Sequence, residues 1–227
     1  MTITDDAGPT ACLAASTRVA GSETLEHALG RATLTIEGDR DACRRRYSLA
    51  STGMRRDMMP GSPRVFAERD DDPALRTGHD LFDALFALAM EEAHENSVGS
   101  IQDYAFDMGR PLPCPEGGCF ETGRLWTYVW TRDTSFSVDL GLASVDPGRA
   151  RNSLLFKLSE RRGGGGEQIV QDTGTGGSYP VSSDRVVWAL GAEALLAELE
   201  GAERTSFRDR AYAAITRTLA HDREIVF

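Results

Sequence analysis

The chain has 227 residues, of which 41% are hydrophobic and 26% charged, a composition typical of a globular protein with one full domain, or one domain and a small companion. Its net charge of −10 opposes phosphate backbones and anionic lipid surfaces, and no segment approaches the roughly 18 apolar residues of a membrane span. We therefore expect no nucleic-acid partner and no membrane partner. The basic run Arg44-Arg45-Arg46 lacks interleaved aromatic residues and is interpreted as a solvated turn.

The features that report on the cellular compartment point in two directions. The first 20 residues carry two aspartates where a signal peptide needs cations, and they lack its apolar core, which argues against export. Cys114 and Cys119, in contrast, bracket a Pro-Glu-Gly-Gly turn and could close a small disulfide loop in an oxidising compartment. A zinc knuckle is the alternative for this pair, but Cys12 and Cys43 are distant and the histidines are scattered. We predict no metal and no cofactor, and the sequence leaves the localisation open.

Residues 1–75 are predicted to form an extended, β-leaning segment that is poor in helix. Within it, residues 32–36 alternate as a strand does, and three prolines interrupt the stretch that follows. The pattern changes at Asp80, where apolar residues begin to recur at helical spacing as far as about Asn96. A helix is therefore predicted over 80–96. Its apolar positions are Leu81, Phe82, Leu85, Phe86, Leu88 and Ala89.

Four further helices are predicted after a long loop at 99–127. The first begins near Thr134, and the next has Asp146 as its N-cap, followed by a first-turn proline. Asp184 is expected to cap the following helix, and the last helix to run over 203–221. Because these helices follow one another without alternating strands, the pattern predicts an all-α architecture of helical hairpins.

A glycine-rich stretch at 172–180 lies between the predicted hairpins. It lacks the Gly-Lys-Ser/Thr ending of a Walker loop and the strand-helix-strand context of a dinucleotide-binding fingerprint, so it is not interpreted as a phosphate site. Its glycines are better explained by a close approach of the backbone to a ligand or a neighbouring loop, with Asp172 offering a carboxylate beside them. An Asx-turn at Asp172 is the structural alternative.

The most informative stretch for function runs from Trp126 to Asp133 and contains three aromatic residues and an Arg-Asp pair. An aromatic face can stack on the apolar side of a pyranose ring, while a guanidinium and a carboxylate bind its hydroxyls. Trp130, Arg132 and Asp133 are therefore candidate sugar-binding residues. The structural alternatives are that the tryptophans are core residues and that the charged pair is an ion pair at a helix start. If the stretch is extended, alternation directs Tyr128 away from both tryptophans and makes it the packing residue.

Residues 128–133, Tyr-Val-Trp-Thr-Arg-Asp, resemble a segment of the six-hairpin glycosidases, the (α/α) toroid enzymes that include glucoamylases and debranching enzymes. In that family the arginine and the aspartate bind the hydroxyls of the sugar in the −1 subsite. The matching positions are Trp130, Arg132 and Asp133. Residues 169–190 are similar to the next loop at the mouth of the ring and the helix after it, with Asp172 as a further candidate contact.

The resemblance implies a mainly α fold, a partial (α/α)6 toroid of helical hairpins over 76–227, preceded by the short β-leaning segment 1–75. The five helices predicted here fall well short of six hairpins, so we expect the chain to be a fragment of a longer protein. An incomplete ring exposes helical faces that the missing hairpins would cover, which implies self-association.

The function implied by the resemblance is glycoside hydrolysis, with an oligosaccharide or glycoside as substrate. Hydrolysis requires two carboxyl groups, one of which protonates the leaving oxygen. In the family these acids come from later loops, so the catalytic residues of this chain are not identified and Glu121 is only a candidate carboxylate at the rim of the site. We expect the chain to be weakly active or inactive. The alternative function is a non-catalytic carbohydrate-binding or interaction fragment.

Overall fold

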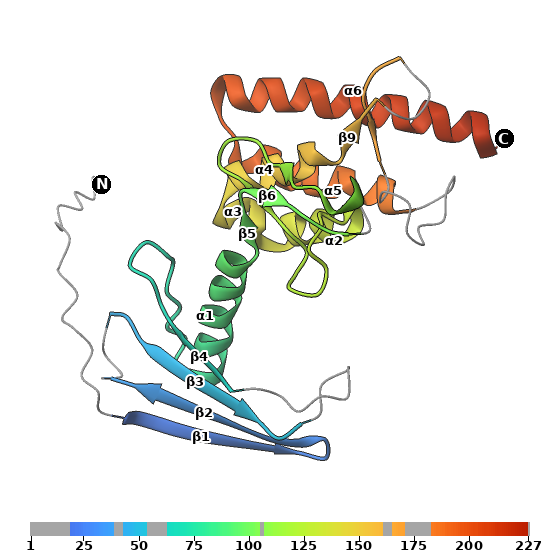
Figure 1. Cartoon of the computed structure of the whole chain (residues 1–227). Helices are drawn as coiled ribbons and strands as arrows, with labels where there is room; N and C mark the ends of the chain where they lie inside the picture. Colours follow the sequence, from blue (N-terminus) through green and yellow to red (C-terminus); the bar gives the residue numbers. More distant parts are fainter. Residues whose placement is uncertain are drawn as a thin grey trace, which may run out of the picture. The chain divides into compact units, whose positions relative to one another are not determined.

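The computed structural model describes residues 19–38, 43–53, 63–104, 107–160, 165–170 and 183–226. The chain divides into two compact units, Met1–His94 and Glu95–Phe227 (Figure 1). Each unit has a hydrophobic cluster of its own, and the two are therefore described separately.

The N-terminal unit is a four-stranded antiparallel sheet packed against one helix, α1 (Asp80–Glu95). The strands are hydrogen-bonded in chain order and are β1 (Val19–His27), β2 (Gly30–Glu37), β3 (Arg46–Ser51) and β4 (Arg64–Ala67). Leu34 and Ile36 are two residues apart on β2 and so bury the same face of the sheet. This core also contains Tyr47, Phe66, Ala84 and Ala87. The predicted strand at 32–36 and the predicted helix from Asp80 are confirmed.

A polar network in the N-terminal unit is centred on the carboxylate of Glu68. This carboxylate accepts hydrogen bonds from the Arg76 guanidinium at 2.6 Å, from the Arg45 backbone N–H at 2.9 Å and from the Tyr47 hydroxyl at 3.0 Å. The Arg45 guanidinium lies 3.3 Å from Oδ2 of Asp83 in the first turn of α1. Because Arg45 is buried by this arrangement, its interpretation as part of a solvated turn is wrong.

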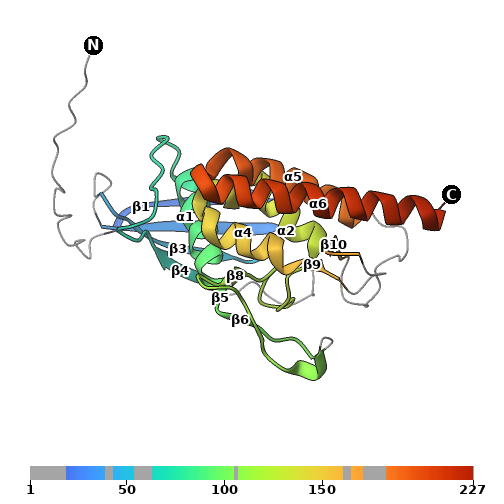
Figure 2. The ribbon, with the colours of Figure 1, turned by 90° about the horizontal axis from the view of Figure 1, so that it is seen from above.

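The helices of the C-terminal unit pack around α5, which contacts α2, α4 and α6 (Figures 1 and 2). Their bounds are α2 (Thr131–Ser137), the π-helical turn η2 (Val138–Leu142), α3 (Ala143–Val145), α4 (Pro147–Phe156), α5 (Ser183–Glu198) and α6 (Gly201–Val226). Trp188 of α5 is fully buried, donates Nε1–H to the Leu154 carbonyl at 3.1 Å and lies with its ring centroid 6.3 Å from that of Phe207. One tryptophan thus joins α5 to both α4 and α6.

A glycine sets the close approach of α5 to α2. A Cβ atom at Gly191 would lie 2.9 Å from the Ser135 carbonyl oxygen and 3.2 Å from the Ser135 Cα atom. No alanine fits at that separation without a shift of one helix, so the absence of a side chain at Gly191 lets α2 pack directly on α5.

Short strands tie the loops of the C-terminal unit together. They are β5 (Ser97–Val98), β6 (Ser100–Ile101), β7 (Leu112–Pro113), β8 (Cys119–Phe120), β9 (Leu158–Ser159) and β10 (Gln168–Ile169), and the 3-10 turn η1 (Asp107–Gly109) lies between β6 and β7. The antiparallel pairs are β5 with β8, β6 with β7, and β9 with β10.

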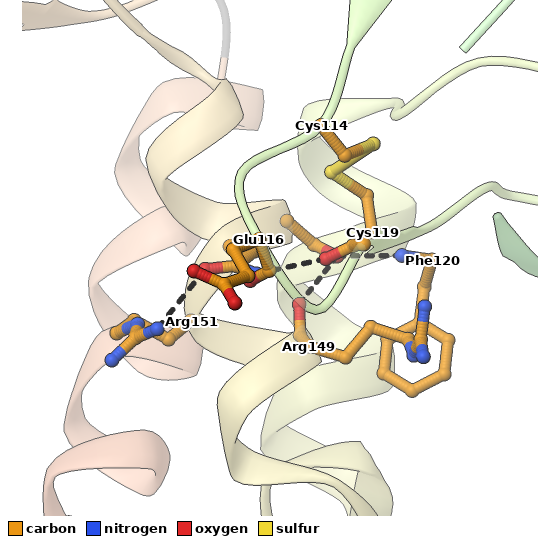
Figure 3. Close-up of a disulfide and its surroundings, with 9 residues drawn as sticks. Cys114, Glu116, Cys119, Phe120, Arg149 and Arg151 are labelled. Carbon is orange, nitrogen blue, oxygen red and sulfur yellow. Dashed lines mark hydrogen bonds between the residues drawn. A yellow bond between two sulfur atoms is a disulfide. The ribbon is translucent and has the colours of Figure 1, made fainter. Parts of the chain in front are cut away.

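A disulfide joins Cys114 to Cys119, as the spacing of the two cysteines predicted, with their Cα atoms 5.7 Å apart (Figure 3). The amide of Asn152 on α4 holds the loop between them by donating to the carbonyl oxygens of Glu116 at 2.8 Å and Gly118 at 2.9 Å. The disulfide loop is therefore fastened to α4 as well as closed by a covalent bond.

The prediction of a mainly α partial toroid is wrong. Of the described residues, 48% are helical and 23% lie in strands, and the N-terminal part is a four-stranded antiparallel sheet rather than a short β-leaning segment. The error has a physical source, because most side chains of β1 are exposed and the strand lacks the apolar alternation that marks a half-buried strand. Among the described residues, no helix combines the length and apolar character needed to cross a membrane.

The predicted helix starts were right for α4 and displaced for two others. Asp146 caps α4, since its Oδ1 accepts the Arg149 backbone N–H at 2.9 Å. In contrast, α2 begins at Thr131 rather than near Thr134, and Asp184 lies in the first turn of α5 rather than before it.

Candidate functional site

The predicted site begins in a turn that leads from β8 into α2. The backbone N–H of Trp126 donates to the Gly123 carbonyl at 2.8 Å, and the Thr122 N–H donates to the Tyr128 carbonyl at 2.9 Å. The Thr122 hydroxyl oxygen in turn accepts the N–H of Trp130 at 3.1 Å. These bonds fold the run back on itself and fix the direction of its side chains, and Trp130 then serves as the N-cap residue of α2 without a capping side chain.

The disulfide loop and α4 support the start of this turn. Ser153 on α4 accepts the Phe120 backbone N–H through its hydroxyl oxygen at 2.8 Å, and the same hydroxyl donates to the Arg149 carbonyl at 2.9 Å (Figure 3). The Arg149 guanidinium carbon also lies 5.7 Å from the centroid of the Phe120 ring. Because Phe120 is only two residues before Thr122, α4 and the disulfide loop together hold the start of the site.

The three aromatic rings of the run have different environments. Tyr128 is only 3% exposed and packs edge-on against Phe156 at 5.9 Å, which confirms that it is a packing residue. Its ring also meets that of Trp130 at 6.4 Å, so the expectation that it points away from both tryptophans is wrong. The ring of Trp130 is partly buried against the same cluster. Trp126 is 60% exposed, and its ring meets that of Trp130 at 5.7 Å with an interplanar angle of 87°. The accessible face for a ligand therefore belongs chiefly to Trp126.

Arg132 and Asp133 lie in the first turn of α2 and do not form an ion pair with each other. Nη1 of Arg132 lies 3.3 Å from Oδ1 of Asp184, with 55% of the arginine side chain and 12% of the aspartate side chain exposed. This contact links α2 to α5 and directs the guanidinium while leaving several of its N–H groups open. Asp133 is exposed, and no described residue forms a hydrogen bond or ion pair with its carboxylate.

Two ionisable groups, Lys157 and Glu121, lie near the aromatic run. Sequence patterns assigned no role to Lys157 and marked Glu121 only as a candidate carboxylate at the rim of the site. Lys157 is 1% exposed, and its ammonium lies 4.8 Å from the centroid of the Tyr128 ring, which is a cation–π contact beneath the site. Glu121 immediately precedes Thr122, and partial burial raises the pKa of its carboxyl above the usual value. No sequence signal marked Lys157, because only the fold brings it against Tyr128.

The other predicted contact, Asp172, lies outside the described residues. Trp130, Arg132 and Asp133 are brought together at the start of α2, so the predicted site is a surface patch. A separate groove of about 610 Å³ lies between the disulfide loop, α4 and α6, and none of the predicted site residues lines it. Within the described ranges, no group of three or more His, Cys, Asp or Glu side chains is arranged to hold a metal ion.

No protein-family model, curated protein or solved structure matches the chain. The residues of this patch and their geometry are therefore the basis on which a function can be inferred.

Proposed function

We propose that the chain binds carbohydrate at the surface formed by Trp126, Trp130, Arg132 and Asp133. The observation that carries the proposal is the exposed Trp126 ring, which is held perpendicular to Trp130 within a few residues of an exposed guanidinium and an exposed carboxylate. An oriented aromatic face with charged hydrogen-bonding groups beside it complements the two kinds of surface on a pyranose, its apolar C–H face and its hydroxyls.

The resemblance to six-hairpin glycosidases supports the proposal through this segment alone. It favours a terminal sugar as the ligand, with Arg132 and Asp133 as partners of its hydroxyls. The ion pair with Asp184 suits Arg132 to this role, because it restricts the guanidinium before the ligand arrives and so reduces the entropy lost on binding.

We further propose that binding dominates over glycoside hydrolysis. Hydrolysis needs a protonated carboxyl and a second ionised carboxylate at a defined separation across the scissile bond. Glu121 has the raised pKa that suits an acid, but Asp184 is engaged by Arg132 and Asp133 projects into solvent. The arrangement supports recognition of a sugar more directly than its cleavage.

Isothermal titration calorimetry with malto-oligosaccharides and with mannosides tests the binding proposal. Trp126→Ala is expected to weaken the affinity about tenfold or more, as truncation of a central aromatic contact does. Asp133→Asn tests the carboxylate without a change of shape. Phe82→Ala, at an exposed aromatic residue of the N-terminal unit, is the matched control and should leave the affinity unchanged. Absence of binding to every sugar would overturn the proposal.

An assay with aryl glycosides separates binding from hydrolysis. We expect sugar binding with negligible turnover. Clear turnover that disappears in Asp133→Ala would show that the chain is an enzyme and that Asp133 has a catalytic rather than only a binding role.

A further inference from the structure

Tyr104 is an exposed aromatic residue whose ring lies close to the backbone of Gly109. It is 90% exposed and follows β6 in the C-terminal unit. A Cβ atom at Gly109 would lie 2.9 Å from Cδ1 and 3.1 Å from Cε1 of Tyr104, so the ring rests against the backbone of that glycine. Gly109 has a φ of +75°, a conformation that glycine adopts without strain. One residue thus supplies both the turn and the space for the ring.

Hydrogen bonds join the Tyr104 loop to the aromatic run of the site. The Gln102 side-chain amide donates to the Gly109 carbonyl at 2.8 Å and so ties the residue after β6 to the end of η1. The Thr127 hydroxyl lies 3.0 Å from the Gln102 carbonyl oxygen and 3.3 Å from Oδ2 of Asp103. Since Thr127 follows Trp126 and Asp103 precedes Tyr104, the two exposed rings are carried by neighbouring segments.

These neighbouring segments carry several large apolar side chains that are exposed to solvent. Their large, exposed apolar side chains are Tyr104, Met108, Leu125 and Trp126. Exposed apolar groups that cluster rather than scatter mark an interaction surface. The Asp103 carboxylate, which precedes Tyr104 in the sequence, accepts the Thr127 hydroxyl at 3.3 Å and so lies beside the segment that carries Trp126.

We propose that Tyr104 and Asp103 form a second sugar-binding subsite beside Trp126, and that the surface therefore selects an oligosaccharide over a single sugar. This inference rests on the proposed function and extends it. A chain of sugars repeats the same pairing of apolar face and hydroxyls, so a second aromatic ring with a carboxylate beside it complements the next sugar unit. Two linked contacts bind a linked ligand more tightly than either contact alone.

The test is a calorimetric titration of the intact chain with methyl glycosides and with oligosaccharides of two to six units from the same malto and manno series. We expect the longer ligands to bind roughly tenfold more tightly than the methyl glycoside. Tyr104→Ala should remove this preference for length while leaving the affinity for the methyl glycoside unchanged. Tyr104→Phe keeps the ring and should retain most of the preference.

Two further variants make the result specific. Gly109→Ala displaces the Tyr104 ring without removing it and should cause the same selective loss of affinity for longer ligands. Tyr212→Ala, at an exposed tyrosine on α6, is the matched control and should change neither affinity.

The possible outcomes separate this inference from the proposed function. Equal affinity for all lengths in the unmodified chain, or a preference for length that survives Tyr104→Ala, overturns the second subsite. If the methyl glycoside still binds through Trp126 in that case, the proposed function stands. Absence of binding to any of the sugars overturns both.

Discussion

Two aromatic pairs, one in each unit, use the same kind of side chain in opposite ways. Tyr47 and Phe66 face each other on adjacent strands, with ring centroids 5.5 Å apart at an interplanar angle of 27°, and both are buried. Trp126 and Trp130 meet at 87°, and the outer ring is 60% exposed. The first pair gains stability by removing both rings from water. In the second pair one ring orients the other, so fixed orientation with exposure, rather than aromatic content, is what suits this pair to the binding role proposed for it.

The largest effect that this comparison predicts is at the buried pair. Tyr47→Ala should destabilise the chain by about 3–5 kcal/mol, because it leaves a cavity beside Phe66 and removes a donor from Glu68. All three tryptophans lie in the C-terminal unit, so in urea the midpoint seen by far-UV circular dichroism should fall more than the midpoint seen by tryptophan fluorescence. Tyr47→Phe, which keeps the ring, should cost far less. Similar costs for the two variants would show that the ring contact is not the source of the stability.

A smaller effect is expected where α2 packs on α5. Gly191→Ala should destabilise the C-terminal unit by about 1–3 kcal/mol, because the added methyl group meets the Ser135 carbonyl. The change should appear in tryptophan fluorescence, which reports on nearby Trp188. Gly148→Ala is the matched control, since its Cβ would have ordinary contact distances. Equal effects of the two substitutions would contradict the close packing of α2 on α5.

Two carboxyl groups should respond to pH with opposite signs. Burial by itself would raise the pKa of Glu68, but hydrogen bonds from Arg76, the Arg45 N–H and Tyr47 outweigh it and hold the pKa below its usual value. Its stabilising contribution is therefore present above the unfolded pKa and is lost as the pH falls through the folded pKa. The raised pKa of Glu121 has the reverse effect, because its contribution is greatest below the unfolded pKa and is lost as the pH rises through the folded pKa.

Urea titrations of Glu68→Gln and Glu121→Gln at acidic and neutral pH measure this difference. Glu68→Gln should lower stability at neutral pH and flatten the loss of stability in acid. Glu121→Gln should raise stability at neutral pH and change little in acid. Parallel pH profiles for the two variants would mean that the hydrogen bonds to Glu68 do not stabilise its charged form.

The smallest expected change in stability is at the exposed ring. Trp126→Ala should alter the free energy of unfolding by no more than about 0.5 kcal/mol, as surface substitutions usually do, while it weakens sugar binding. Circular dichroism in urea measures the stability, and calorimetry measures the binding. A loss of stability well above that value would place Trp126 in the core and remove the reason for calling the patch a site.

Local sequence signals correctly predicted the elements that are specified by residues close together in the sequence. The apolar repeat at helical spacing located α1, and Asp146 followed by a proline located the start of α4, because both patterns act within a few residues. The sequence predicted that Tyr128 packs in the core, but not which way it points: the run is a turn rather than an extended strand, and the Tyr128 ring meets that of Trp130 at 6.4 Å.

The remaining features depend on contacts that are distant in the sequence. Arg132 pairs with Asp184, and Arg45 is buried through Asp83, so the partners of these charges could not be inferred from their neighbours. The number of strands in the sheet was underestimated because β1 has mostly exposed side chains and so shows no apolar alternation in the sequence. The strand is stabilised by its hydrogen-bonded pairing with β2.

The burial of Lys157 makes the chain unusual as a subject for protein chemistry. The chain has 25 lysines and arginines, and Lys157 is the only lysine among them. In the folded state, reagents that acylate amines have no access to its buried ammonium. Its modification requires the C-terminal unit to open around Tyr128, so the rate of acylation at this one position reports how often that unit opens. A mass spectrum recorded over time would thus follow local unfolding with a single natural label.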